Sequence, residues 1–183
     1  DAGEDTRDAI VWVGSLWTLK RPDLLLELAR RLPDRKFVIM GGDFASEAGY
    51  SARIRAEAAL LPNVTITGRI PNHEVEAVLR RAAVLVNTSD VEGFPNAYLE
   101  AWSLRVPVIA RHDIDGIIAS SGAGMIAESL EDMTEALRAL GDETLRRTMG
   151  EAARRCALER FSPQRLGAEY LDFFSALLAS RKK

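Results

Sequence analysis

Short apolar runs alternate with segments of helical periodicity along most of the chain. Each run is four or five residues long, and Gly, Pro or Asn follows most of them, which is typical of buried strands. The predicted strands are residues 10–13, 37–40, 64–67, 83–86, 106–110 and 124–127. The predicted helices are residues 22–32, 46–60, 73–79, 95–104, 113–121, 129–140, 142–160 and 163–180, with Asn72 as the N-cap of the third. This alternation predicts an α/β fold, a doubly wound parallel sheet of about six strands, with ligands beyond the carboxyl ends of the strands.

The most informative stretch is residues 87–103, which follow the fourth predicted strand. They pass through a turn containing Gly93 and Pro95 and then become helical. Pro95 suits the first helical turn because its missing amide hydrogen would have no partner there, and Gly93 lets the backbone approach a ligand closely. The free N–H groups and the dipole at the start of this helix favour an anion at the mouth of the sheet.

Two carboxylates flank this turn, Glu92 just before it and Glu100 within the helix. A carboxylate repels phosphate, so both residues are better suited to binding hydroxyl groups, whose hydrogens an ionised carboxylate accepts. A helix start for phosphate together with two acceptors for hydroxyls describes a site for a sugar nucleotide. Taken alone, Glu92 is better explained as a loop residue and Glu100 as a solvated helix residue.

Residues 92–102, which read EGFPNAYLEAW, and the PVI sequence at 107–109 resemble the signature of retaining GT-B glycosyltransferases of family 4, or glycosyl transferases group 1. That signature is two glutamates separated by seven residues, a Gly-Phe-Pro turn between them and a Pro-Val strand after the helix. The resemblance extends from about residue 10 to the last helix. It implies the Rossmann-like, C-terminal donor-binding half of a GT-B fold.

The resemblance also implies an activity. A hexosyltransferase would move a sugar from a nucleotide diphosphate sugar, a UDP- or GDP-sugar, to a glycan or lipid-linked acceptor with retention of configuration. No metal or other cofactor is expected. The N-terminal acceptor-binding domain would be the partner of this half, so we expect the isolated domain to be inactive and any peripheral membrane association to involve the missing half.

The family motif assigns the expected roles residue by residue. Lys20 matches the lysine that contacts the donor diphosphate, and with Glu92 it is the expected catalytic pair. Glu100 would hold the ribose diol. The backbone from Gly93 to Asn96 would orient the donor sugar beside Glu92. The donor-binding residues expected in this turn are Glu92, Gly93, Phe94, Pro95, Asn96 and Glu100.

Four further donor-binding candidates come from other loops, namely Ser15, Arg21, Arg69 and Ile70. Ser15 stands where the family has an arginine, so either Arg21 supplies the second positive charge or the diphosphate is less well neutralised. Arg69 and Ile70 occupy the backbone position that borders the nucleobase in similar proteins.

Two alternatives to a transferase remain open at this stage. Ser15 in place of arginine also suits a module that binds a nucleotide or sugar without catalysis. A GT-B-like sugar-nucleotide epimerase is a third candidate, although its additional acid and base residues cannot be identified in this sequence.

Composition narrows the picture further. The 183 residues, 47% hydrophobic and 28% charged, suit one globular domain, and the net charge of −3 without a basic stripe argues against a nucleic-acid partner. A single cysteine, Cys156, excludes an internal disulfide and fits a reducing compartment. No apolar run reaches the roughly 18 residues of a membrane span, and no metal-ligand spacing is found. We therefore expect a cytoplasmic protein, peripheral to the inner face of the membrane if the missing half binds lipid.

The polar first residues and the initial Asp1 suggest that this chain was excised from a longer one. We accordingly expect residues 1–8 to be the remnant of a linker. Residues 9–183 would form the donor-binding domain, including the C-terminal helices. The last helix carries an apolar stripe, which we interpret as core packing; the resemblance implies instead that part of the stripe covers the missing domain.

Overall fold

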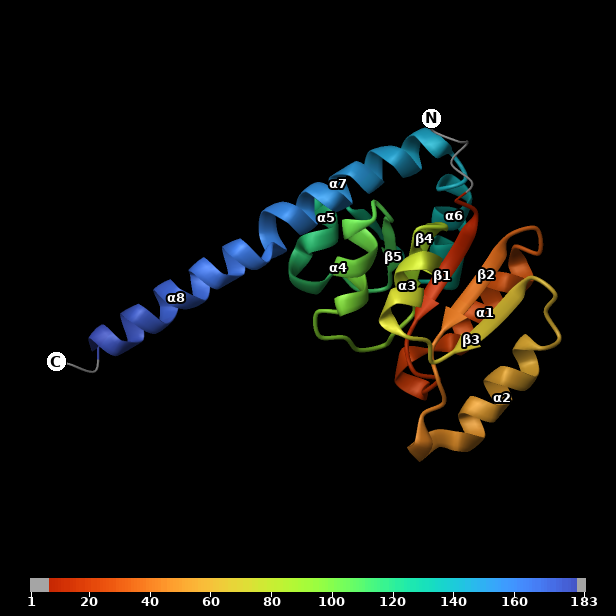
Figure 1. Cartoon of the computed structure of the whole chain (residues 1–183). Coiled ribbons are helices and arrows are strands. Elements are labelled where there is room, and N and C mark those ends of the chain that lie inside the picture. The colour runs from red at the N-terminus through yellow and green to blue at the C-terminus, as the bar shows by residue number, and fades with distance from the viewer. Residues whose placement is uncertain (1–6, 181–183) are drawn as a thin grey trace.

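The computed structural model describes residues 7–180 and contains a six-stranded sheet whose neighbouring strands are all parallel. The strand order is β3-β2-β1-β4-β5-β6 (Figure 1). The strands are β1 (Ala9–Val13), β2 (Lys36–Met40), β3 (Val64–Gly68), β4 (Ala82–Asn87), β5 (Val108–Ala110) and β6 (Gly124–Ile126). The predicted doubly wound, Rossmann-like fold is confirmed.

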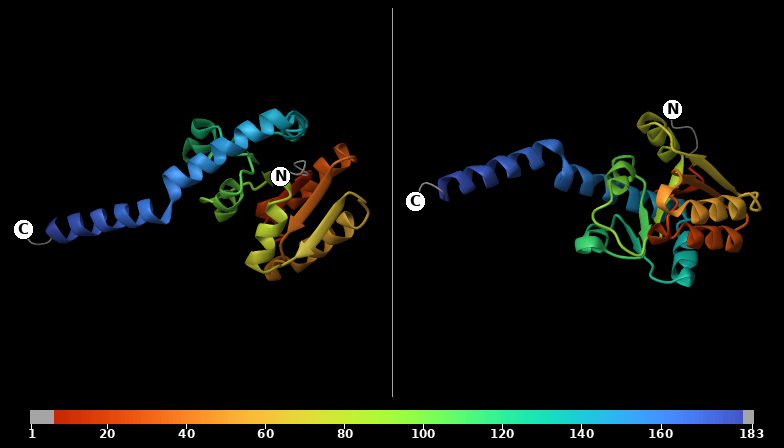
Figure 2. Two further views of the ribbon diagram at one scale, coloured as in Figure 1. Left: turned by 45° about the horizontal axis from the view of Figure 1, so that its top comes forward. Right: turned by 90° about the horizontal axis from the view of Figure 1, so that it is seen from below.

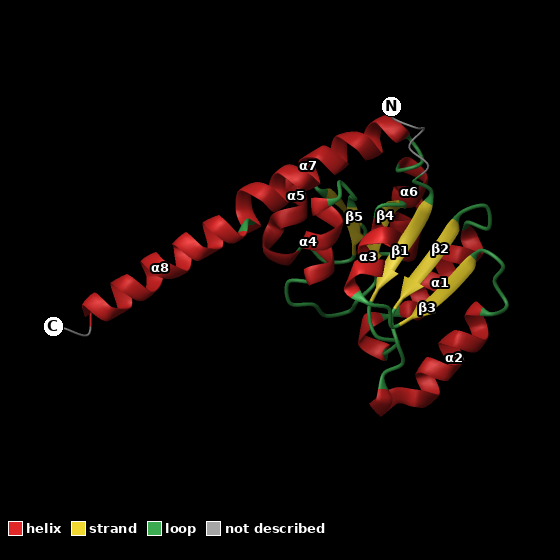
Figure 3. Ribbon diagram, viewed as in Figure 1, coloured by secondary structure: helices red, strands yellow, loops and turns green. Residues whose placement is uncertain are grey.

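Helices cover both faces of this sheet, as the layers in Figure 3 show. They are α1 (Pro22–Arg31), α2 (Ala48–Ala58), α3 (Asn72–Leu79), α4 (Asn96–Ser103), α5 (Ile117–Ser121), α6 (Leu130–Ala139), α7 (Glu143–Phe161) and α8 (Pro163–Ser180). Helices α1, α2 and α6 form one buried layer, and α3, α4, α5 and α7 form the other. The strands are apolar on both sides because each side is covered by a helix layer.

Three local predictions were wrong. Asn72 is the first helical residue of α3 and Pro71 is its N-cap, so the Asn72 side chain does not cap the helix. Pro95 likewise precedes α4 as its N-cap, one position earlier than predicted. Strand β5 starts at Val108 because Pro107 has no N–H to donate to a neighbouring strand.

Two glycines let the strand ends approach one another near the mouth of the sheet. A Cβ atom on Gly41 would lie 1.7 Å from the carbonyl oxygen of Gly14, so any larger residue would push the ends of β1 and β2 apart. Gly68 at the end of β3 has a φ of 74°, which glycine adopts without strain. Both positions bring the loops after β1, β2 and β3 together.

Helix α8 leaves the body of the domain, as the views in Figures 1 and 2 agree. Its apolar stripe is exposed: the relative accessibility of Tyr170 is 63%, of Phe173 62% and of Leu178 64%. The interpretation of this stripe as core packing within the domain is therefore wrong.

The expected linker remnant lies mostly outside the described residues, which begin at Arg7. Cys156 is buried in α7, in agreement with a packing role.

Candidate functional site

The candidate site lies where the chain reverses its direction of travel across the sheet. Strands β1, β2 and β3 are added toward one edge, and β4 then pairs with the other side of β1. The loops that follow β1 and β4 therefore meet at the carboxyl ends of two adjacent strands, which is the usual ligand position in open α/β sheets. Lys20 comes from the first loop and Glu92 from the second.

Lys20 and Glu92 form an ion pair. The Lys20 ammonium donates a hydrogen bond to Glu92 Oε1 at 2.6 Å. The two side chains are 30% and 13% exposed, respectively, so water screens the pair only in part. The sequence predicted both residues as site residues, but not that they would contact each other.

The strand-end residues of β4 hold Glu92 in place. Asn87 Nδ2 donates to Glu92 Oε1 at 3.2 Å, and Ser89 Oγ donates to the same oxygen at 2.7 Å. The Asn87 side-chain oxygen in turn accepts from the Ser89 backbone N–H, which fixes the turn. Glu92 therefore keeps two neutral donors besides Lys20.

A buried hydroxyl fixes the backbone that carries Lys20. Thr88, which has no exposed surface, accepts from Trp12 Nε1 at 2.9 Å and donates to the Lys20 carbonyl oxygen at 2.8 Å. The Asp90 N–H also donates to the Leu19 carbonyl at 2.9 Å. The loops after β1 and β4 are thus joined at two points beside the ion pair.

A pocket of about 180 Å³ opens at this ion pair. It is lined by Lys20 and Glu92 and by the start of α4, including Pro95, Asn96 and Tyr98. Burial, and secondarily the charge of Glu92, raises the pKa of Tyr98, so its hydroxyl stays protonated. A cation, a carboxylate and the N–H groups of a helix start therefore converge on one small pocket.

A second pocket, of about 220 Å³, shares Val13 with the first. It brings together Ser15, Arg69 and Ile70, and includes the paired glycines at the end of β2. Ser15, from the loop after β1, therefore lines the same pocket as Arg69 and Ile70, from the loop after β3.

Glu100 lies in a third pocket, of about 400 Å³, between α3 and α4. This pocket shares Val75 with the pocket of Arg69 and Ile70. Desolvation raises the pKa of the Glu100 carboxyl. The two motif glutamates thus sit at opposite ends of a row of three pockets.

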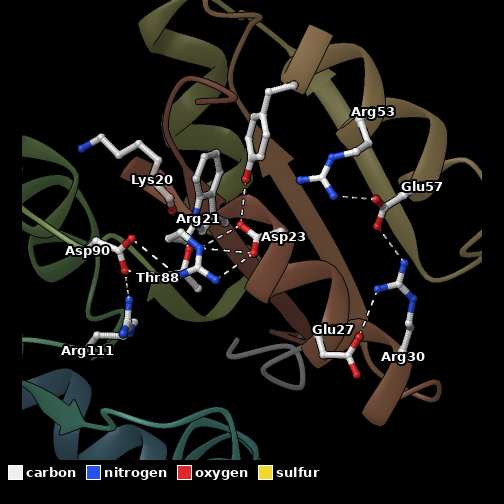
Figure 4. Close-up of polar contacts among 12 residues, drawn as sticks. Lys20, Arg21, Asp23, Glu27, Arg30, Arg53, Glu57, Thr88, Asp90 and Arg111 are labelled. Atoms are coloured by element: carbon white, nitrogen blue, oxygen red, sulfur yellow. Dashed lines mark hydrogen bonds and ion pairs between the residues drawn. The ribbon is translucent and has the colours of Figure 1, made fainter. Parts of the chain in front are cut away.

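Arg21 does not line the Lys20 pocket. Its guanidinium binds Asp23 at 2.9 Å and Asp90 at 3.3 Å, and Asp90 also pairs with Arg111. Figure 4 shows this cluster and the Lys20 side chain extending away from it. Arg21 therefore joins the loops at this edge and lines neither the Lys20 pocket nor the Ser15 pocket.

The Phe94 side chain is also structural. Its ring stacks on Phe161 of α7 at a centroid distance of 4.9 Å, and meets Tyr98 and Trp102 of α4 edge-on. Phe94 therefore anchors the motif turn to two helices, and only its backbone remains a candidate for ligand contact. Gly93 is exposed on the same turn.

Sequence reasoning missed the residues that support the site, namely Trp12, Asn87, Ser89 and Thr88. The available signal was a cluster of three short polar residues directly after an apolar strand, at the predicted ligand mouth. Their partners could not be read from the sequence because each contact depends on the packing of β1 beside β4.

Residues 7–180 contain neither a cluster of metal ligands nor a helix that could cross a membrane. No group of three or more His, Cys, Asp or Glu side chains is arranged to hold a metal ion. None of the described helices combines the length and the apolar character needed to cross a membrane.

The fold and these pockets define a Rossmann-like domain with a polar site at the switch point of its sheet. The family model described as Glycosyl transferases group 1 matches residues 7–143. The chain belongs to this family.

Individual relatives agree with this assignment. The chain is 28% identical, over 202 aligned residues, to a GDP-mannose-dependent alpha-(1-6)-phosphatidylinositol monomannoside mannosyltransferase of Mycolicibacterium smegmatis; the match covers 98% of this chain and 51% of the relative. It is 42% identical over 112 residues to the putative teichuronic acid biosynthesis glycosyltransferase TuaC of Bacillus subtilis, covering 61% of this chain and 26% of TuaC. The chain thus spans about half the length of these relatives or less.

A solved structure gives the same fold. The C-terminal domain of the group 1 glycosyl transferase LpcC from Francisella tularensis aligns with a TM-score of 0.75 at 20% identity, over 85% of this chain and 86% of that domain. The predicted correspondence to the C-terminal half of a GT-B glycosyltransferase is confirmed at the level of the fold.

Proposed function

We propose that this chain is the donor-binding half of a hexosyltransferase that takes a sugar from a nucleotide diphosphate sugar and transfers it with retention of configuration. The observation that carries the proposal is the convergence of Lys20, Glu92 and the start of α4 on one pocket. A cation and free N–H groups suit a diphosphate, and a carboxylate suits sugar hydroxyls. Family membership supports the same reaction class.

The three pockets suggest how the donor would lie. The diphosphate would meet Lys20 and the N–H groups of α4, and these donors would stabilise the charge that develops on the leaving diphosphate. Glu92 and the backbone from Gly93 to Asn96 would orient the sugar. Arg69 and Ile70 would border the base, and Glu100 would accept the ribose hydroxyls from the third pocket.

The names of relatives suggest which nucleotide the donor carries. A UDP- or GDP-sugar is the candidate, since one relative is named as GDP-mannose-dependent. A related fold, HepE from Anabaena, was solved in complex with UDP. The acceptor, a glycan or a lipid-linked molecule, would bind to an N-terminal partner domain. Without that domain we expect nucleotide binding but little turnover, and we place the reaction in the cytoplasm.

Calorimetric titration of the chain with UDP, GDP and ADP tests the proposal. We expect one nucleotide to bind selectively, and Glu100→Ala to weaken it about tenfold or more, because a charge-assisted hydrogen bond to the ribose is lost. Leu158→Ala, which changes an exposed side chain on α7, serves as the control. Unchanged affinity in Glu100→Ala would remove Glu100 from the ribose role, and no binding of any nucleotide would contradict the proposal.

Lys20 is tested by the choice of ligand. Lys20→Ala should weaken a nucleoside diphosphate far more than the bare nucleoside, because only the diphosphate carries the charge that an ammonium neutralises. Equal losses for both ligands would argue against a phosphate contact.

A second candidate, a nucleotide-binding module without catalysis, is favoured by Ser15. Arg21 is bound to Asp23 and Asp90 and lines neither the Lys20 pocket nor the Ser15 pocket. Arg69 shares a pocket with Ser15 and is the cation available there. If Arg69 compensates, Arg69→Ala should weaken diphosphate binding and Ser15→Arg should change it little. A large gain in diphosphate affinity in Ser15→Arg would instead indicate that this chain neutralises the diphosphate poorly, which favours the module without catalysis.

A further inference from the structure

The Lys20 ammonium has one hydrogen-bond acceptor among residues 7–180, the Glu92 carboxylate. Under the proposed function this same ammonium binds the donor diphosphate. An ammonium at 2.6 Å from a carboxylate is already neutralised, and a diphosphate that approaches it also meets the negative charge of Glu92. The ammonium has three N–H donors, but its single positive charge does not offset the charges of both the carboxylate and the diphosphate.

The contacts around the ion pair hold the Glu92 carboxylate more firmly than the Lys20 ammonium. Glu92 Oε1 also accepts from Asn87 and Ser89, so the carboxylate remains held when Lys20 leaves. The backbone of Lys20 is fixed through its carbonyl by Thr88, whereas its side chain is a flexible four-carbon stem. Rotation of the Lys20 side chain is therefore enough to move its ammonium from Glu92 to the diphosphate.

We propose that Glu92 and the diphosphate compete for the Lys20 ammonium, so that Glu92 lowers the affinity of the site for a nucleoside diphosphate. This inference rests on the proposed function and adds a second role for Glu92. When the diphosphate takes Lys20, the Glu92 carboxylate loses its cation and is available to sugar hydroxyls. After the sugar has left, Glu92 competes again for Lys20 and favours release of the diphosphate product.

Glu92→Gln tests the competition. Glutamine keeps an oxygen that accepts from Asn87 and Ser89 but carries no charge, so the turn should be preserved. We expect inorganic pyrophosphate, and whichever of UDP and GDP binds, to bind roughly tenfold more tightly to Glu92→Gln than to the unmodified chain. Glu135→Gln removes the same charge from an exposed position on α6 and should leave affinity unchanged.

A double-mutant cycle separates competition from simple repulsion by a nearby negative charge. In a Lys20→Met background, competition predicts that Glu92→Gln changes the affinity less than about threefold, since no ammonium is left to share. Tightening that persists without Lys20 would overturn the inference.

Two further outcomes distinguish a failure of the competition from a failure of the proposed function. If Glu92→Gln leaves diphosphate affinity unchanged or weaker while Glu100→Ala still weakens the nucleotide, the competition is wrong and the proposed function stands. If neither the unmodified chain nor Glu92→Gln binds pyrophosphate, UDP or GDP at millimolar concentration, both are wrong. Thermal unfolding of each variant confirms that it is folded, and Glu92→Asp, whose carboxylate is one methylene shorter, should tighten binding in the same direction.

Discussion

Arg105 adopts a backbone conformation that arginine disfavours. It follows the C-terminus of α4 with a φ of 60°, in the left-handed region that favours glycine. Its side chain bonds Glu151 at 2.6 Å, but both side chains are exposed, so this pair contributes little. Glycine would adopt this conformation without the strain that a Cβ atom causes.

We therefore expect Arg105→Gly to stabilise the domain by about 0.5–1 kcal/mol, since relief of the left-handed conformation outweighs the greater freedom of glycine in the unfolded chain. Chemical denaturation measures the change. Arg105→Ala removes the same ion pair without relieving the backbone, so an alanine variant as stable as the glycine variant would contradict this explanation.

The buried Thr88 hydroxyl positions the backbone of Lys20 in the candidate site. Thr88→Val keeps the shape but leaves the Trp12 indole N–H and the Lys20 carbonyl without their partner. We expect a loss of about 1–3 kcal/mol in unfolding free energy. Diphosphate binding should weaken as well, because Lys20 is less well positioned. Thr88→Ser retains the hydroxyl and should preserve both properties; equal damage in the serine variant would point to the lost methyl group instead.

At the scale of elements, Asp23 joins the first turn of α1 to its neighbours. It accepts from Arg21 before the helix and from Tyr50 of α2 at 2.7 Å. Desolvation by burial opposes ionisation of Asp23, but the hydrogen bonds from Arg21 and Tyr50 outweigh it and lower the pKa of the carboxyl below its usual 3.8. The ionised carboxylate therefore stabilises the packing of α1 on α2.

The sign of the pH dependence follows from this shift. The folded-state pKa lies below the unfolded value, so the stabilisation is complete above about pH 4 and is lost as the pH falls through the folded-state pKa. We expect Asp23→Asn to be less stable at neutral pH and to lose stability less steeply below about pH 4. Denaturation curves between pH 2 and pH 7 provide the measurement, and parallel pH profiles would exclude Asp23 as a source of the dependence.

At the scale of the whole molecule, the sheet and its two helix layers form the stable body, and α8 extends beyond it (Figure 2). Along α8 only Leu166 is half-buried among residues 163–178, so this helix buries little apolar surface against the domain. Its exposed Tyr170, Phe173 and Phe174 form a surface of the kind that promotes association.

Deleting residues 163–183 should therefore change the Tm by less than about 2 °C, because the side chains of residues 163–178 contribute little to the core. The shortened chain should also self-associate less at high concentration. Calorimetry and analytical ultracentrifugation test the two expectations. A fall in Tm of more than about 5 °C would mean that α8 supports the fold more than its exposure indicates.

The sequence by itself determined the class of the fold and most element bounds. Alternating apolar runs and helical periodicity, the Gly-Phe-Pro turn and the glutamate spacing are all encoded within short windows of chain. The errors at Asn72 and Pro95 were shifts of a single residue at helix starts, where side-chain preferences for neighbouring positions differ little.

Only the tertiary structure decided how these parts act together. Lys20 and Glu92 are 72 residues apart, and Lys20 and Thr88 are 68 apart. Their contacts exist because β4 pairs with β1 and not with β3, a choice of strand order that depends on the packing of the whole sheet. For the same reason the sequence could not show that Arg21 is bound to Asp90, or that the apolar stripe of α8 lies outside the core.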